Sequence, residues 1–200
     1  SILSQYGPFD SLPSNSDYCR IVNDLHFERL KGLLDDARQQ GGVTIFGGKC
    51  DAESKLIEPT LLEGMAESCL IMQEESFGPI LPMITFTDMD DVLSDINSRP
   101  KPLALYVYSN EKSTQNKVIQ RTSAGDSCIN QIAIHFMHPH LPFGGVNNSG
   151  LGKTGGRWGF EAFSHQRSVL EDKLGAAAFL RPPYTPRIHG MIKNAIKFFT

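Results

Sequence analysis

The feature that most constrains the fold is an alternation of apolar and helix-forming stretches in the middle of the chain. Three apolar stretches predicted as strands alternate with two predicted helices, in the order 80–86, 88–98, 103–108, 112–122 and 127–134. Strands separated by helices at this spacing favour βαβ crossovers, which bring the strands together in a parallel sheet. The stretch 103–108 is almost continuously apolar, as in a strand buried on both faces. The sequence therefore predicts an α/β fold with a sheet rich in parallel strands.

The N-terminal part carries one long predicted helix. Apolar side chains recur at steps of three and four residues over 17–40, Ser16 can cap the start, and two glycines follow the end. After it, residues 43–46 read as a short strand and residues 56–62 as a second extended piece. Pro59 within that piece favours a sheet edge or a bend, because proline has no N–H to donate to a ladder.

Composition excludes several classes of protein. The 200 residues carry 19 Lys and Arg against 22 Asp and Glu, a net charge of −3, so there is no basic surface that would indicate nucleic-acid binding. No apolar run approaches the ~20 residues that a membrane span needs. The four cysteines are widely spaced and residues 1–8 show no signal-peptide pattern, so we expect reduced thiols and a cytoplasmic protein.

The segment 135–156 is predicted to be a long glycine-rich loop, although its letters suggest phosphate binding. Residues 150–155 read G-x-G-x-x-G and residues 152–154 read G-K-T. Both phosphate-binding motifs need a strand immediately before them and a helix after them. The preceding H-P-H-L-P at 138–142 cannot form a central strand, and Gly159 interrupts the following helical stretch. We therefore expect a plain loop here.

The same region holds a group of potential metal ligands: Cys128, His135, His138 and His140. Structural zinc sites usually include a C-x2–4-C pair, which is missing, and residues 128–156 contain no carboxylate. The sequence therefore predicts ordinary loop histidines and no metal site.

Two further stretches carry more chemical information. Residues 73–79 read Q-E-E-S-F-G-P and lie in a predicted turn between two extended pieces, where Glu75 and an aromatic ring could face a cleft. Residues 141–150 read L-P-F-G-G-V-N-N-S-G. Together they resemble the E-E-x-F-G-P and P-F-G-G-x-x-x-S-G motifs of the aldehyde dehydrogenase superfamily. Residues 17–34, 101–106 and 160–167 resemble its class 3 and fatty aldehyde dehydrogenase branch in particular.

The resemblance covers about residues 17–170 and implies roles for five side chains. Glu75 is similar to the glutamate that holds the nicotinamide-ribose hydroxyls of NAD or NADP, and Phe77 to the aromatic ring beside that ribose and the nicotinamide. On the substrate side, Phe143 is similar to an aromatic residue near the aldehyde tunnel. Asn130 and His135 match class 3 positions close to the active site.

The implied activity is the NAD(P)-dependent oxidation of an aldehyde, aliphatic or otherwise apolar, to a carboxylic acid. In the family, a cysteine in a G-Q-x-C motif is the nucleophile, assisted by a general-base glutamate and an oxyanion asparagine. None of the three has a match in residues 1–200, so no catalytic residue is assigned. We expect the C-terminal portion of an enzyme more than twice as long. The alternative is a non-catalytic truncated product that binds a partner through its oligomerisation surface.

The resemblance also divides the chain. Residues 1–156 are expected to form a partial catalytic domain and residues 157–172 an oligomerisation segment, whose extended part near 164–170 would join a sheet of a homodimer. Residues 173–200 form a tail with five basic residues and no acidic ones.

Within the tail, residues 186–200 are predicted to form an amphipathic helix. The apolar stripe consists of Ile188, Met191, Ile192, Ala195, Ile196 and Phe199. Such a helix could lie in the surface of an anionic membrane, with Lys193 and Lys197 near the headgroups. The alternative is that it packs over a neighbouring subunit or over the substrate entrance.

Overall fold

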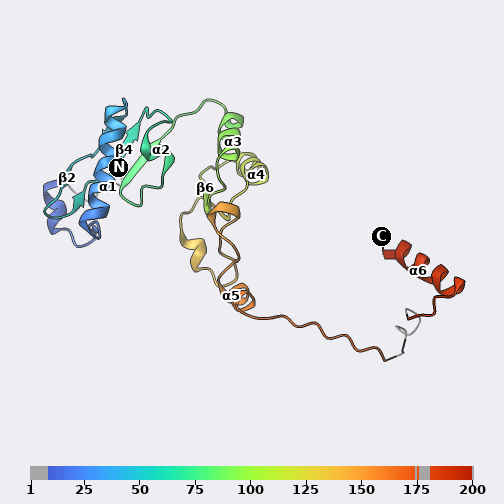
Figure 1. Cartoon of the computed structure of the whole chain (residues 1–200). Coiled ribbons are helices and arrows are strands. Elements are labelled where there is room, and N and C mark those ends of the chain that lie inside the picture. Colours follow the sequence, from blue (N-terminus) through green and yellow to red (C-terminus); the bar gives the residue numbers. More distant parts are fainter. Residues whose placement is uncertain (1–8, 174, 176–180, 200) are drawn as a thin grey trace. The chain divides into compact units, whose positions relative to one another are not determined.

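The computed structural model describes residues 9–173, 175 and 181–199 (Figure 1). The chain divides after Val92 into two compact units, which we describe one at a time. The first unit contains, in chain order, η2 (Phe9–Ser14), α1 (Asp24–Gln39), β1 (Val43–Phe46), β2 (Cys50–Asp51), β3 (Leu56–Ile57), β4 (Thr60–Glu63), α2 (Leu70–Gln73) and β5 (Ile80–Met83).

Helix α1 begins at Asp24, so the prediction of a helix from residue 17 with Ser16 as its cap is wrong. Asn23 is the N-cap: its backbone is extended and its side-chain oxygen accepts a hydrogen bond from the His26 N–H at 2.9 Å. The backbone N–H of Ile21 donates instead to the Lys55 carbonyl at 3.0 Å. The residues before Asn23 are therefore held by the β2–β3 region and do not continue the helix.

The main sheet of the first unit has the order β1-β4-β5. Strand β1 runs antiparallel to β4, and β4 runs parallel to β5 with Thr60 opposite Ile80 and Glu63 opposite Met83. Strands β2 and β3 form a separate antiparallel pair. The predicted extended piece 56–62 is thus two strands, interrupted before β4 at Pro59, and they belong to different sheets.

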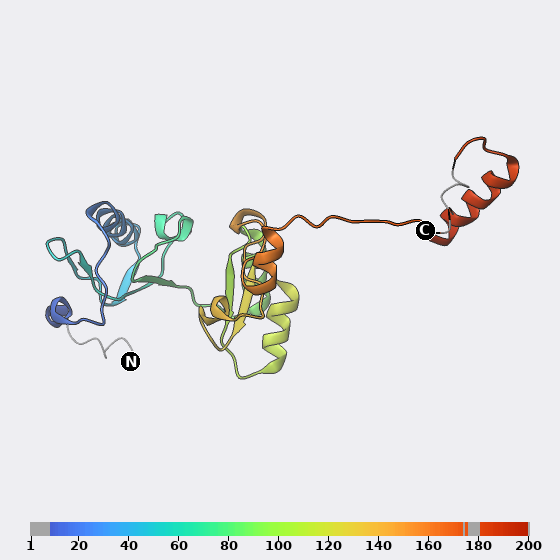
Figure 2. The same ribbon diagram turned by 90° about the horizontal axis from the view of Figure 1, so that it is seen from below.

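The core of this unit lies between α1 and one face of the sheet. Helix α1 buries its apolar side chains at the spacing of a helix face, and α2 lies on the same side of the sheet (Figure 2). The buried cluster consists of Phe27, Leu30, Leu33, Leu34, Ala37, Ile57, Leu62, Cys69, Ile71 and Ile80. On the opposite face the side chains of Val43 and Leu81 remain 58% and 57% exposed.

The second unit is built on a βαβ crossover. Strands β6 (Ala104–Val107) and β7 (Asp126–Ile129) are parallel, with α4 (Lys112–Arg121) between them in sequence. This confirms the crossover predicted for residues 103–134. Within the first unit, β5 pairs in parallel with β4, a neighbour that the sequence did not predict. The result is an α/β fold with mixed and parallel sheets.

Two details of this unit also differ from expectation. Of β6 only Val107 is buried, while the flanking Leu103 and Tyr108 are 42% and 63% exposed, so the strand is not buried on both faces. Strand β7 stops at Ile129 because the chain turns: Asn130 has a φ of +54°, outside the strand region.

The segment after β7 is mostly irregular, as predicted. It contains the short 3-10 turns η3 (Ile134–Met137) and η4 (Asn147–Ser149), followed by α5 (Gly156–Ala162). In the part of the chain that the structure describes, residues 164–170 pair with no strand. A pairing with a second subunit, like the domain limits at 156 and 172, stays a prediction.

The predicted tail helix is present as α6 (Pro186–Phe199). Residues 174, 176–180 and 200, and the side chain of Phe199 in the predicted stripe, lie outside what the structure describes. Among the described helices, including α3 (Met89–Ser98), none is long and apolar enough to cross a membrane.

Candidate functional site

The first candidate site is the turn of residues 74–79 between α2 and β5. Glu75 and Phe77 both lie on its surface, and the Phe77 side chain is 77% exposed. Phe77 has a φ of +47°, in the left-handed region that a residue with a bulky side chain rarely adopts. This conformation costs roughly 1–2 kcal/mol, so it persists only where the surrounding structure imposes it.

Helix α1 holds this turn in place. The Arg29 guanidinium donates hydrogen bonds to two successive backbone carbonyls, those of Glu75 (3.3 Å) and Ser76. Next to them, a Cβ atom at Gly78 would lie 2.6 Å from both methyl carbons of Leu30, so any larger residue there would require the buried Leu30 side chain to shift. The turn is therefore seated on α1 by polar and apolar contacts together.

The two exposed groups fit the ribose and nicotinamide of a dinucleotide coenzyme. In the described part of the chain, the Glu75 carboxylate makes no hydrogen bond or ion pair, so its oxygens can accept from two ribose hydroxyls. The exposed ring of Phe77, two residues further on, offers an apolar surface to a flat ring. This turn can therefore hold one end of the coenzyme.

The second candidate site surrounds His135 in η3. Its imidazole contacts two aromatic rings edge-on, Tyr106 at 5.9 Å and Phe143 at 5.4 Å between ring centroids. Both ring nitrogens are buried and find no hydrogen-bond partner among the described residues. Phe136 also lies against Phe143, with 6.1 Å between the ring centroids. Predicted residues His135 and Phe143 therefore lie together in an aromatic cluster.

Asn130 has a different environment. Its side-chain oxygen accepts a hydrogen bond from the Ser109 N–H at 2.8 Å, and its amide donates to the Ser109 carbonyl at 3.0 Å. These bonds tie the end of β7 to the connection between β6 and α4. The structure thus gives Asn130 a structural role, and its predicted place near the substrate stays a prediction.

The P-F-G-G loop is attached to β7 by a charged network. Lys153 donates to the carbonyls of Gly125 (2.8 Å) and Gly144 (2.5 Å), and its ammonium lies 3.7 Å from the Asp126 carboxylate. That carboxylate in turn accepts the Gly144 N–H at 2.9 Å. Phe143 and Thr154 exchange backbone hydrogen bonds across the loop. The lysine of the G-K-T sequence is therefore used within the protein.

The elements on either side of the glycine-rich sequence 150–155 explain why it does not form a phosphate site. Residues 150–155 follow η4 and a bend, and α5 behind them has only seven residues. A phosphate loop requires a strand immediately before it, whereas the described residues directly before residue 150 form the 3-10 turn η4.

The four cysteines are free thiols with different exposure. Cys19 is exposed, Cys69 is buried, and Cys50 and Cys128 are intermediate. Burial raises the pKa of the Cys50 thiol, which disfavours the reactive thiolate. Within the described residues, no group of three His, Cys, Asp or Glu side chains is arranged to hold a metal ion.

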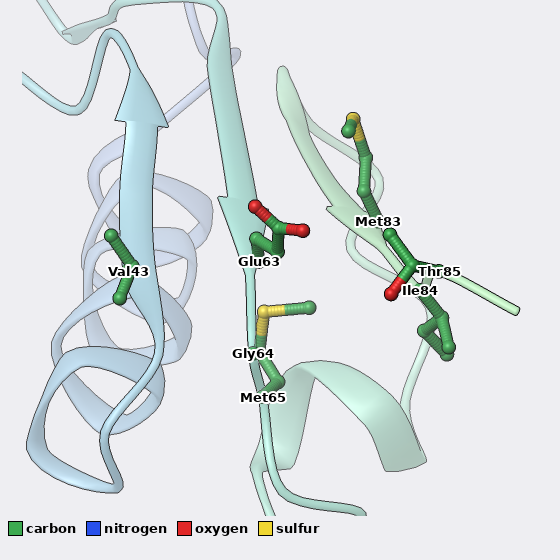
Figure 3. A pocket seen from close by; sticks show the side chains of 7 residues that line it. All are labelled: Val43, Glu63, Gly64, Met65, Met83, Ile84 and Thr85. Carbon is green, nitrogen blue, oxygen red and sulfur yellow. The ribbon is translucent and has the colours of Figure 1, made fainter.

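A hollow of about 420 Å³ lies at the main sheet of the first unit, away from the turn of residues 74–79 (Figure 3). Val43 lines it from β1, Glu63 and Met65 from β4 and the segment after it, and Met83 and Ile84 from the end of β5. It contains none of the five predicted site residues.

Comparison with known proteins identifies the family. Residues 6–169 match the model of the aldehyde dehydrogenase family, so the chain belongs to that family. Its relatives include members of family 3: it is 41% identical over 172 residues to aldehyde dehydrogenase family 3 member H1 of Arabidopsis thaliana, covering 86% of this chain and 35% of that protein. The resemblance to the class 3 branch is thus confirmed.

Solved structures agree with this assignment. A substrate-bound structure of Staphylococcus aureus AldH aligns with this chain at a TM-score of 0.79 and 37% identity. The alignment covers 100% of this chain and 42% of the AldH chain. The Mycobacterium tuberculosis aldehyde dehydrogenase complexed with NAD+ matches 76% of this chain and 32% of its own, with a TM-score of 0.69 and 29% identity. The chain spans about four tenths of the length of the curated relatives that it matches, from 36% to 39% for three of them.

Sequence reasoning missed the residues that position the two sites. Nothing in the local sequence connects Arg29 to the turn 46 residues further on, and Tyr106 read only as part of an apolar strand. In the sequence, Lys153 stands out only as part of a G-K-T phosphate motif, whereas in the structure its ammonium holds the loop of Phe143.

We expect Lys153→Met to destabilise the second unit by about 1–3 kcal/mol, because it leaves two carbonyls without their donor and removes the cation beside the Asp126 carboxylate. Urea unfolding measures the loss, and hydrogen exchange at residues 142–146 should show that it starts in the loop. The exposed Lys101→Met is the matched control. Equal stability of the two variants would show that the network does not hold the loop.

Proposed function

We propose that this chain forms part of the coenzyme and aldehyde sites of an NAD(P)-dependent aldehyde dehydrogenase, which oxidises an aldehyde to a carboxylic acid. The observation that carries the proposal is the turn of residues 74–79. It holds Phe77 in a strained backbone conformation with its ring exposed, next to the Glu75 carboxylate, which has no partner among the described residues. Strain of this kind gathers at ligand-binding positions.

On the coenzyme side, Glu75 accepts hydrogen bonds from the nicotinamide-ribose hydroxyls and Phe77 packs beside that ribose and the nicotinamide. When bound, NAD(P) supplies the acceptor for the hydride of the aldehyde. NAD and NADP differ at the adenosine end and share the ribose that Glu75 would contact. This half of the site therefore supports either coenzyme.

On the substrate side, the cluster of Tyr106, His135, Phe136 and Phe143 supports an apolar aldehyde. Aromatic rings offer large apolar contact areas, while one or a few polar groups fix the orientation of a ligand. The buried imidazole nitrogens of His135 are polar groups of this kind. Phe143 and His135 would line the aldehyde path, and Asn130 would lie close to the active site.

This chain supplies no nucleophile in the proposal. The cysteine, the general base and the oxyanion donor act in the rest of a longer protein, and residues 164–170 pair with a second copy in a homodimer. The relatives are more than twice the length of this chain, which supports this reading. Nothing in the comparisons favours a non-catalytic truncated product.

The test replaces Glu75 by Gln in the complete enzyme, or in a chimera where this chain replaces the matching segment of Staphylococcus aureus AldH. Loss of a charged acceptor should raise the coenzyme KM about tenfold, because such hydrogen bonds contribute about 1.5–3 kcal/mol. The exposed Glu67→Gln is the control, since it changes the same charge elsewhere. A coenzyme KM and a hydride-transfer rate that both match the control would contradict the assignment.

A second role concerns α6, whose apolar side chains Met191 and Ile196 remain 49% and 58% exposed in the described structure. Two roles are open to this helix: packing over a neighbouring subunit or the substrate entrance, or lying on an anionic membrane surface with its lysines near the headgroups. Vesicle binding tests the membrane role. Deleting residues 186–200 should then reduce sedimentation with phosphatidylserine vesicles but not with neutral vesicles. Equal binding with and without the helix would favour packing over a neighbouring subunit or the substrate entrance.

A further inference from the structure

We propose that Arg29 is a positioning residue of the coenzyme site. Its guanidinium fixes the backbone of residues 75 and 76, and thereby the placement of the Glu75 carboxylate and the Phe77 ring. The inference rests on the proposed function, because it gives Arg29 a part in coenzyme binding through residues that were assigned there.

The contacts of Arg29 are made to backbone atoms, which sets the path of the chain. One nitrogen donates to the Glu75 carbonyl at 3.3 Å and the other to the Ser76 carbonyl. The two bonded residues come immediately before Phe77, whose φ is +47°. A planar guanidinium can hold two successive carbonyls at once, whereas the ammonium of a lysine is a point charge without that fork.

The contact with Glu74 cannot account for this arrangement. The Arg29 guanidinium lies 4.0 Å from the Glu74 carboxylate, and the Glu74 side chain is 49% exposed. Exposed ion pairs at such distances contribute little to stability. The bonds to the carbonyls are therefore the interactions that hold the turn.

The part of α1 that carries Arg29 is anchored in the core of the first unit. Its neighbour Leu30 is completely buried, and both methyl carbons of Leu30 face Gly78 on the far side of Phe77. The turn is thus held on α1 before and after the strained residue. Because α1 belongs to the core of the first unit, the turn takes its position from that core.

The same helix provides a matched control. Arg38 donates to the Gly48 carbonyl at 2.8 Å and to the Thr44 hydroxyl at 3.2 Å, so it also ties a loop to α1. That loop contains none of the proposed site residues. A general loss of stability would follow from either arginine, whereas an effect on the coenzyme should follow only from Arg29.

The experiment compares Arg29→Met, Arg29→Lys and Arg38→Met. In the 200-residue chain, Arg29→Met should speed hydrogen exchange at residues 75–78 about tenfold, a change worth about 1.4 kcal/mol, and Arg38→Met should leave it unchanged. In the complete enzyme or the chimera, Arg29→Met should raise the coenzyme KM about tenfold with little change in the aldehyde KM. Arg29→Lys keeps the charge and should not restore the wild-type coenzyme KM.

The other possible results contradict either the role of Arg29 alone or the coenzyme site as a whole. If Glu75→Gln raises the coenzyme KM and Arg29→Met does not, Arg29 has no positioning role although the proposed site stands. If neither variant changes the coenzyme KM, the proposed coenzyme site is wrong, and the role of Arg29 with it. Full recovery with Arg29→Lys, or equal effects of Arg29→Met and Arg38→Met, would reduce Arg29 to a charge or a stability contact.

Discussion

The contact between α1 and the turn of residues 74–79 is the interaction on which the proposed coenzyme site depends. Helix α1 is fixed by the five apolar side chains that it buries against the main sheet, so its position follows from the hydrophobic effect. Arg29 and Leu30 of this helix contact the turn of residues 74–79, between α2 and β5, and so fix its position relative to α1. A strained residue such as Phe77 can then keep one orientation although its ring has few contacts of its own.

The second unit uses the same principle with other residues. The loop of Phe143 has little regular structure, and the charged network of Lys153 and Asp126 fastens it to the start of β7. Both candidate sites are thus irregular segments whose backbone is bonded to a regular element. This arrangement gives functional side chains on irregular segments a defined geometry, which is how loops commonly carry function on a rigid scaffold.

The sequence predicted the elements better than their pairing. The alternation around residues 103–134 correctly indicated β6, α4 and β7, because hydrophobic periodicity is a local property. It misplaced the start of α1, because the bond between Ile21 and Lys55 is a tertiary contact that competes with the helix. It did not predict that β5 pairs with β4, since strand spacing alone does not specify which neighbour a strand pairs with.

The site residues divide in the same way. The two motifs pointed to Glu75, Phe77 and Phe143, and the structure shows that Phe143 lies against His135. Arg29 and Tyr106 could not be predicted, because their importance comes from contacts with residues that are distant in sequence. Lys153 shows the opposite error: a local match to a phosphate motif had no meaning without the strand that such a motif requires.

The central claim is that this chain carries one half of the coenzyme site and part of the aldehyde site but no nucleophile. The most direct measurement is NAD(P)H absorbance when the purified 200-residue chain is mixed with coenzyme and aliphatic or aromatic aldehydes. The account predicts no aldehyde-dependent signal, because an activated thiolate, a base and oxyanion donors must act together. Turnover that is lost when Cys19, Cys50, Cys69 or Cys128 is replaced would contradict it, because the nucleophile would then lie within these residues.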